Sequence, residues 1–320
     1  MKKIKLSLFW TASFENSIIF KLIKFLSKKE IEFTTPSKCD LLIIGAYDTY
    51  SIKRKFVNTL KRKINKIEDF FPNIDIYSLN RKMKPLRIFY SQENYPFPQI
   101  KFDYTITPHL AITNENHLRY PIWKDLIDWS HLGLGREEDI FIKRFGMFFN
   151  IKDLMLPQGA EFLNKKKKIC LITSHLNEPR KSMYEKFSKN FTVDGYGPYF
   201  EKNIQNHNSG KIKKIDIFKG YSFNLCPENG LNPGYYTEKI PESFLGKCLP
   251  ISWADNNINN DFNEKSFVNL INYTKDNYQE ISYLLKEENF LKKYINEPLL
   301  INEPTLDKEI AFMSKIINSL

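Results

Sequence analysis

The chain has 320 residues, of which 42% are hydrophobic and 15% aromatic, so its length and composition predict two globular domains. Its net charge of +11 fits nucleic acid, an anionic membrane face or a phosphorylated small substrate as partner. No apolar run approaches the roughly 20 residues that cross a bilayer, and the four cysteines show no metal-binding spacing. A membrane-spanning protein and a cysteine-based zinc site are therefore not expected.

In the first half of the chain, short apolar runs alternate with segments of helical periodicity. We predict helices at 16–29, 51–65 and 137–149, and strands at 3–10, 39–47, 74–79, 86–90, 102–107 and 118–123. The strands are almost continuously apolar. This pattern is typical of a parallel sheet covered on both faces by helices.

A domain boundary is predicted near residue 160, where Pro157, Gly159 and the lysine run 165–168 follow one another. We interpret the lysine run as a solvated linker. Beyond it the alternation resumes, with strands predicted at 167–174, 191–197, 220–226, 247–254 and 266–273, and helices at 179–190, from Thr237 onward and at 304–320. The Thr237 hydroxyl is the predicted N-cap of its helix. The last helix is amphipathic and is expected to pack on one lobe or to bridge both.

Polar residues directly after predicted strands are candidate site residues, because ligands of open α/β sheets bind at the carboxyl ends of strands. Glu93 follows the strand 86–90 between prolines and aromatics, and such surroundings raise the pKa of a carboxyl group toward that of a general base. Arg180 lies in the first turn of a predicted helix, where the helix N-terminus and the guanidinium both suit phosphate oxygens. Taken alone, each segment is better explained by an ordinary surface residue.

The stretch YSFNLCPENGLNPGYYTEK, residues 221–239, crowds polar groups between two apolar runs. Lys239 and the unpaired N–H groups of a helix start are expected to face an anion, and Glu238 to hydrogen-bond hydroxyl groups. Carboxylate, amide and phenol groups beside a cationic helix start suit a ligand that carries both a sugar and phosphates. No Walker A or GxGxxG motif occurs, so an ATPase or a dehydrogenase lacks its usual support.

At these residues the chain resembles the family 10 glycosyltransferases, the α-1,3/4-fucosyltransferases, and in particular their bacterial members. The family pattern F-E-N, Y-V-T-E-K, P-I-x-W and D-F-x-x-K-S-F-V-N stands here as PEN, YYTEK, PISW and DFNEKSFVN. Weaker matches in SQENYPFPQIKFDYTIT, RYPIW and NEPRKSMYEKF extend the resemblance over residues 86–272 in the same order.

The resemblance implies the α/β fold called GT-B, in which two Rossmann-like lobes with parallel sheets flank a cleft and a C-terminal helix closes the structure. We accordingly expect an acceptor-side domain at 1–160, a GDP-sugar-binding domain at 161–300, and a helix at 301–320 that packs back.

By motif match, Glu93 falls on the family's proposed catalytic base, and Arg180 and Lys239 fall on its diphosphate-binding cations. Glu238 falls on the acid that stabilises the fucosyl ring as charge develops. The other positions expected at the donor site are Ser174, Asn224, Glu228, Asn229 and Tyr235.

The implied reaction is inverting transfer of L-fucose from GDP-fucose to O3 or O4 of GlcNAc in a cell-surface glycan, N-acetyllactosamine-like or O-antigen. Fixed Arg and Lys side chains can take the charge of the departing GDP. No metal or other cofactor is therefore expected, with at most mild stimulation by Mn²⁺ or Mg²⁺. We expect a cytoplasmic protein, either free or peripheral at the inner face of the membrane, without a nucleic-acid partner.

Two alternatives stay open at this point. Pro227 replaces the family's usual aromatic residue and Tyr236 a small β-branched one, so another GDP-sugar is the second candidate donor with the same fold and mechanism. The net charge would also fit a non-catalytic basic binding protein, although no basic helix or aromatic platform accompanies it.

Overall fold

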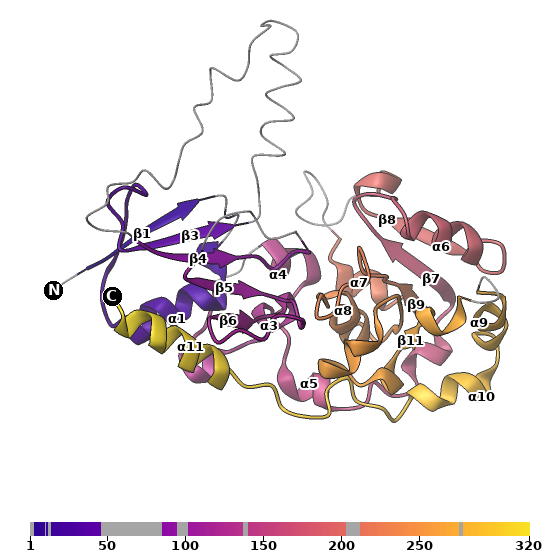
Figure 1. Cartoon of the computed structure of the whole chain (residues 1–320). Helices are drawn as coiled ribbons and strands as arrows, with labels where there is room; N and C mark the ends of the chain where they lie inside the picture. The colour runs from indigo at the N-terminus through magenta and orange to yellow at the C-terminus, as the bar shows by residue number, and fades with distance from the viewer. Residues whose placement is uncertain are drawn as a thin grey trace, which may run out of the picture. The chain divides into compact units, whose positions relative to one another are not determined.

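The structure is a computed structural model that describes residues 3–9, 11, 14–45, 85–94, 102–136, 140–202, 212–274 and 278–320. The chain divides into two compact units, each built around a parallel sheet (Figure 1). The first unit contains residues 1–108, 112–120 and 306–320, and the second contains 109–111 and 121–305. Residues 121–160, which we assigned to the first domain from the sequence, therefore group with the second unit.

The first unit holds a six-stranded sheet in the order β2-β1-β3-β4-β5-β6, with every described pair of strands parallel. Its strands are β1 (Ile4–Phe9), β2 (Ile31–Phe33), β3 (Leu41–Gly45), β4 (Leu86–Tyr90), β5 (Tyr104–Thr107) and β6 (His117–Arg119). Strand β3 is buried along its whole length, as expected for a central strand covered on both faces. The strands predicted at 3–10, 39–47, 86–90 and 102–107 are confirmed. The helix predicted at 51–65 and the strand at 74–79 lie outside the described residues.

Helix α1 (Ile18–Ser27) confirms the helix predicted at 16–29, and local residues set both of its ends. The Ser17 hydroxyl accepts a hydrogen bond from the backbone N of Phe20 at 3.1 Å, which satisfies a first-turn donor. Lys28 adopts a left-handed conformation with φ of 50° and ends the helix.

Helix α11 (Asp307–Asn318) packs on α1 and belongs to the first unit (Figure 1). The Phe312 ring meets the Tyr104 ring edge-on at a centroid distance of 5.6 Å, and Lys315 Nζ donates to Asn116 Oδ1 at 3.0 Å. The closing C-terminal helix expected from the sequence is therefore present.

The second unit holds a five-stranded parallel sheet in the order β11-β10-β9-β7-β8. Its strands are β7 (Lys167–Ile172), β8 (Val193–Tyr196), β9 (Tyr221–Leu225), β10 (Leu249–Ser252) and β11 (Val268–Asn269). The chain runs outward from β7 to β8 and then returns to β9 on the other side of β7. The direction of winding therefore changes between β7 and β9, which is where ligands bind in doubly wound folds.

The described helices of the second unit are α3 (Ile122–Asp125), α4 (Ile140–Phe145), α5 (Ile151–Met155), α6 (Arg180–Phe187), α7 (Lys214–Phe218), α8 (Lys239–Leu245), α9 (Gln279–Leu284) and α10 (Glu288–Leu291). Helix α5 packs against α8 and α4 against α7. These contacts explain why residues 121–160 group with the second unit. Together the two parallel sheets and their helices confirm the predicted α/β class.

Two predicted strands are shorter than expected, because a cap or a proline starts another element inside them. The strand predicted at 118–123 ends at Arg119, since Pro121 is the N-cap of α3. The strand predicted at 266–273 is only β11, because the Asn269 side chain accepts from the backbone N of Ile271 and begins a 3₁₀ turn. The short elements β2 and α7 were not predicted.

The interpretation of lysines 165–168 as a solvated linker is wrong for Lys165. Its Nζ donates to the backbone oxygens of Phe218 at 2.9 Å, Gly246 at 3.0 Å and Lys247 at 2.7 Å. These carbonyls end α7 and α8, where a cation compensates unpaired acceptors and the negative end of the helix dipole. Lys165 therefore ties the start of β7 to the ends of two helices.

Replacing Lys165 by Met is expected to lower the free energy of unfolding by about 1.5–3 kcal/mol, because charge-assisted hydrogen bonds to buried carbonyls are lost. Lys166→Met is the matched control, since Lys166 is exposed next to it. Urea unfolding of both variants measures the difference. Equal stability of the two variants would show that Lys165 has no structural role.

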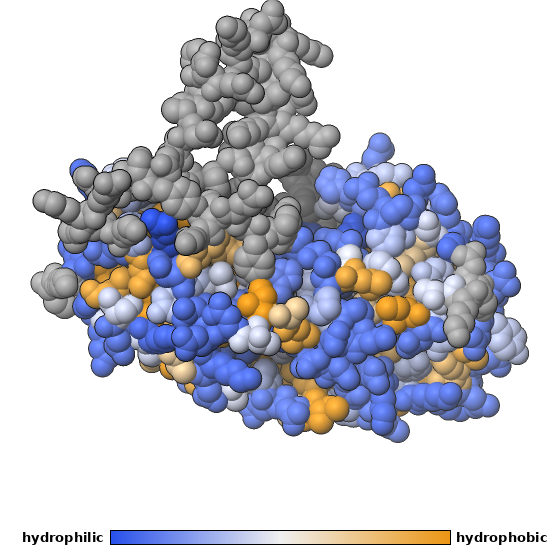
Figure 2. All heavy atoms as spheres, in the orientation of Figure 1, coloured by the Kyte–Doolittle hydropathy of each residue, from blue (hydrophilic) through white to orange (hydrophobic). Residues whose placement is uncertain are grey.

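The visible surface of the described residues is mostly hydrophilic, with separate apolar patches (Figure 2). Among the helices that the structure describes, none combines the length and the apolar character needed to span a membrane.

Candidate active site

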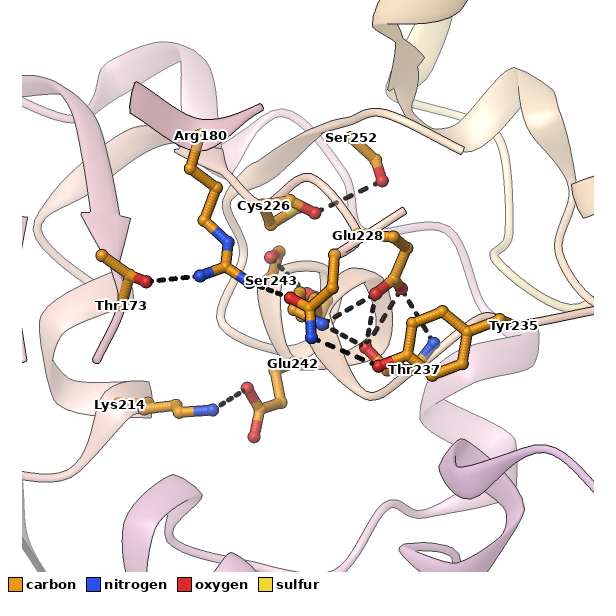
Figure 3. Close-up of polar contacts among 12 residues, drawn as sticks. Thr173, Arg180, Lys214, Cys226, Glu228, Tyr235, Thr237, Glu242, Ser243 and Ser252 are labelled. Atoms are coloured by element: carbon orange, nitrogen blue, oxygen red, sulfur yellow. Dashed lines mark hydrogen bonds and ion pairs between the residues drawn. The ribbon is translucent and has the colours of Figure 1, made fainter. Parts of the chain in front are cut away.

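Two loops at the carboxyl ends of β7 and β9 bring distant residues together at the change of winding direction. The loop after β7 leads to Arg180, the first residue of α6, and the loop after β9 leads to Lys239, the first residue of α8. Figure 3 shows Arg180 extending from one side toward the loop that carries Glu228, Tyr235 and Thr237. Two positively charged helix starts therefore converge on one edge of the sheet.

Arg180 is held by acceptors from both loops. Its Nη1 donates to Thr173 Oγ1 and to the His175 backbone oxygen, each at 2.9 Å, and its Nη2 donates to Asn229 Oδ1. All three acceptors are neutral oxygens. Burial lowers the pKa of Arg180 although nearby Glu228 opposes this, and a guanidinium stays charged in any case. Within the described part of the chain, no carboxylate forms an ion pair with this guanidinium.

Thr173, which sequence reasoning did not single out, is itself held closely by the end of β8. Its backbone N donates to the Tyr196 oxygen at 2.9 Å. Gly197 follows with φ of +99°, and a Cβ on Gly197 would lie 2.3 Å from the Thr173 oxygen. A glycine is therefore required at this contact, and it fixes the acceptor that orients Arg180.

Glu228 is fully buried and organises the start of α8. Its carboxylate accepts from the Thr237 backbone N at 2.8 Å, from the Thr237 hydroxyl at 3.0 and 3.1 Å, and from Lys239 Nζ at 2.7 Å. Lys239 Nζ also donates to Thr237 Oγ1 at 2.8 Å. Burial lowers the pKa of Lys239, but Glu228 and Glu238 raise it more, so its pKa lies above the ordinary value. Lys239 is therefore a fixed cation.

The prediction that the Thr237 hydroxyl caps α8 is wrong. The N-cap position is Glu238, without a side-chain cap, and the Thr237 hydroxyl is occupied by Glu228 and Lys239. An N-cap hydroxyl accepts from a first-turn N–H, but the Thr237 oxygen accepts from the charged Lys239 Nζ instead, while its proton is donated to Glu228. The Thr237 hydroxyl therefore bonds to the Glu228–Lys239 ion pair and not to a backbone N–H at the start of α8.

Asn224 and Tyr235 are both buried, and each contacts the protein rather than solvent. Asn224 Nδ2 donates to Ser243 Oγ at 2.6 Å, and Cys170 Sγ donates to Asn224 Oδ1 at 3.5 Å. This arrangement connects β7, β9 and α8. The Tyr235 hydroxyl accepts from Nδ2 of the exposed Asn229 at 3.4 Å.

Glu238 is half-buried one residue before α8, between cations from several elements. Burial would raise the pKa of its carboxyl group, but Lys239, Lys214 and Arg144 together with a backbone hydrogen bond lower the pKa to about 2. The carboxyl group is therefore ionised at neutral pH. An ionised carboxylate here can face a positive charge that develops on a bound ligand.

The remaining predicted residues lie in loops after strands. Ser174 is half-buried beside Thr173, but it is the Thr173 hydroxyl that contacts Arg180. Glu93 follows β4 in the first unit and is half-buried, with its backbone N donating to Ser91 Oγ at 3.2 Å. The structure thus brings Arg180, Asn229, Tyr235, Glu228 and Lys239 together in the second unit.

Three charged residues on or beside α8 were missed by sequence reasoning. Lys214 of α7 and Glu242 of α8 form a buried ion pair with an Nζ to Oε2 distance of 2.5 Å, and Arg144 of α4 acts on Glu242 through space (Figure 3 shows the pair). Lys214 lies 28 residues from Glu242. No local signal predicts such a pair.

A separate cavity of about 340 Å³ lies at the amino ends of β7 and β9. Its lining includes Phe162, Lys168, Ser222, Phe223, Leu285 and Lys286. None of the candidate residues lines it, so it belongs to the opposite edge of the sheet. In the described residues, no cluster of three or more His, Cys, Asp or Glu side chains has the geometry to hold a metal ion.

The chain is similar in sequence and in fold to known proteins. Residues 162–297 match the family model "Glycosyltransferase family 10 (fucosyltransferase) C-term". The Alpha-(1,3)-fucosyltransferase FucT of Helicobacter pylori is 24% identical over 293 residues, which cover 83% of this chain and 58% of that relative. The chain thus spans little more than half the length of this relative.

Two solved structures share the fold. A crystal structure of an alpha1,3-fucosyltransferase superimposes with a TM-score of 0.66 at 21% identity, covering 99% of this chain and 90% of that one. The crystal structure of an alpha1,3-fucosyltransferase with GDP-fucose gives a TM-score of 0.65 at 22% identity, covering 98% and 90%. The fold is therefore GT-B, as expected from the sequence.

Proposed function

We propose that the protein transfers L-fucose from GDP-fucose to a glycan, because residues 162–297 match the model of the C-terminal domain of glycosyltransferase family 10, the fucosyltransferase family. The acceptor group in this proposal is a hydroxyl, O3 or O4 of GlcNAc in an N-acetyllactosamine-like or O-antigen glycan. The transfer inverts the configuration at the sugar carbon.

The chemistry assigns one task to each charged residue. The acceptor oxygen bonds to C1 of fucose while the bond from C1 to the diphosphate oxygen breaks, and the bonding pair leaves with GDP. Glu93 takes the proton of the acceptor hydroxyl as general base. Glu238, ionised at neutral pH, faces the positive charge that develops on the sugar ring of an oxocarbenium-like transition state.

The single observation that carries the proposal is the convergence of Arg180 and Lys239 at the change of winding direction. Arg180 has only neutral acceptors among the described residues, so its charge is available to an anion. Lys239 is fixed by Glu228 at 2.7 Å. Fixed cations stabilise a departing diphosphate without reorganisation, which is the role that a metal fills in other transferases. The proposal therefore needs no metal cofactor.

The test is product analysis after incubation of the full chain with GDP-fucose and N-acetyllactosamine-type acceptors in buffer that contains EDTA. We expect a fucosylated product whose anomeric configuration, determined by NMR, is opposite to that of the donor. Release of GDP without a fucosylated acceptor, or retention of configuration, would contradict the proposed reaction.

A second GDP-sugar is the competing donor, and one observation favours testing it. Tyr236 is fully buried between the donor-site residues Tyr235 and Thr237, and its hydroxyl donates to both carboxylate oxygens of Asp255 at 3.1 Å. A large fixed ring here shapes the loop that follows β9. A panel of GDP-sugars assayed with one acceptor distinguishes the donors, and turnover of another GDP-sugar without turnover of GDP-fucose would decide for the alternative.

A further inference from the structure

The surroundings of Glu238 contain a charge cluster formed by the half-buried Arg144 and the buried Lys214 and Glu242, on three helices that pack together. Helix α7 packs against α8, and α4 packs against α7. Lys214 and Glu242 form the ion pair of the cluster, and their side chains are only 8% and 4% exposed. A pair buried to this degree carries a large desolvation cost, so its presence requires an explanation beyond stability.

Glu242 is coupled directly to Glu238 through the helix backbone. The Glu242 backbone N donates to the Glu238 oxygen at 2.8 Å, so the two residues are one helical turn apart on the same face. Two carboxylates at this spacing repel each other unless cations compensate them. Lys214 contacts Glu242 directly, and burial raises the pKa of Glu242 while Lys214 opposes this.

Arg144 supplies the second cation of the cluster. Its Nε is buried, and in the described part of the chain it has no hydrogen-bond partner. The guanidinium acts through space on both Glu238 and Glu242. The positive charge of Arg144 therefore favours the ionised form of both carboxylates.

We propose that Arg144 and Lys214 are positioning residues that keep the Glu238 carboxyl group ionised where the donor sugar binds, and that Glu242 anchors Lys214 there and so holds the start of α8. This proposal rests on the proposed function for the role of the sugar, but the state of Glu238 can be tested without turnover. The cations that favour the charged form are Lys239, Lys214 and Arg144, and burial opposes it.

Other charged groups lie on the two loops and on helices α4, α5 and α7. Glu228 and Arg180 face Lys239 from the two loops. The remaining charges on α4, α5 and α7 are the exposed Lys143, Lys152, Asp153 and Asp216, and the caps of α7 add the half-buried Lys213 and the exposed Lys219. These exposed groups are screened by solvent and are suitable as controls.

The decisive variant is Arg144→Gln, because Arg144 is only half-buried and forms no ion pair within the described residues. Arg144→Lys keeps the charge, and Lys143→Gln on the same helix is the matched control. The carboxyl carbon of Glu238 is titrated by ¹³C NMR, with its signal assigned by its loss in Glu238→Gln. We expect the Glu238 midpoint to rise by about one pH unit in Arg144→Gln and to stay near that of the unmodified protein in Arg144→Lys and Lys143→Gln.

GDP affinity is expected to stay unchanged in Arg144→Gln, since the diphosphate contacts are assigned to Arg180 and Lys239. Absence of transfer in every variant would contradict the proposed function alone, because the NMR titration does not depend on turnover.

Lys214 is tested by removing both members of its pair. The single variant Lys214→Met leaves a buried unpaired carboxylate and is expected to unfold easily, whereas Lys214→Met/Glu242→Met replaces both charges and should fold. Removing Lys214 raises the Glu238 pKa and removing the like-charged Glu242 lowers it, so the double variant is expected to move the Glu238 midpoint less than Arg144→Gln does. An unchanged Glu238 midpoint in Arg144→Gln would overturn the proposal.

Discussion

Replacing Glu93 by Gln is expected to abolish fucose transfer while the affinity for GDP stays nearly unchanged. The amide keeps the size of the side chain and leaves the hydrogen bond between the backbone N and Ser91 in place, but it cannot take the acceptor proton. Loss of a general base lowers the rate by about 10²- to 10⁴-fold. GDP binding is assigned to the second unit and should not depend on this residue.

Initial rates of transfer and calorimetric titration with GDP measure the two parts of this prediction separately. Glu32→Gln is the matched control, because Glu32 is exposed on β2 of the same unit. Full activity of Glu93→Gln would remove Glu93 from the role of base. Loss of GDP binding in the same variant would show that Glu93 acts on the donor instead.

Replacing Lys239 by Met is expected to have two separable effects, on stability and on GDP binding. Glu228 is only 1% exposed and loses its ion-pair partner, which lowers the free energy of unfolding by about 3–5 kcal/mol. The same change removes one of the two cations assigned to the diphosphate. Loss of one charge-assisted contact of about 1.5–3 kcal/mol weakens GDP binding by roughly 10- to 100-fold.

The double variant Lys239→Met/Glu228→Met separates the two effects. It leaves no unpaired buried charge, so we expect most of the lost stability to return while the weak GDP binding persists. Urea unfolding and GDP titration of the single and double variants measure this. Lys219→Met is a control, since Lys219 forms an exposed pair with Asp216 that should contribute little. Recovery of GDP affinity in the double variant would show that Lys239 serves only to neutralise Glu228.

The sequence by itself determined the secondary-structure class and the location of the site along the chain. Apolar runs of strand length predicted β3, β4 and β9 closely, because the central strands of a covered parallel sheet are largely buried and therefore mostly apolar. Periodicity predicted α1 and α11. The motif around YYTEK located the loop after β9 that carries most of the candidate site, because this pattern is local and needs only neighbouring residues.

Local signals failed where a contact with a distant residue competed with them. Thr237 looks like an N-cap in sequence, but Glu228 takes its hydroxyl. Lys165 looks like part of a solvated run, but it reaches the carbonyl of Lys247, 82 residues away. In both cases the charged group gains more from a buried partner than from the local structure.

Only the tertiary structure decided which charges meet. Arg180 and Asn229 are 49 residues apart and Lys214 and Glu242 are 28 apart, yet both pairs are in contact. The order of the strands, with β7 beside β9, brings the two loops to one edge of the sheet. Electrostatic interactions in a partly buried site depend on distance and desolvation, and both are set by packing rather than by residue type. For that reason the sequence determines which residues are candidates, and the fold determines which charged residues interact electrostatically with Glu238.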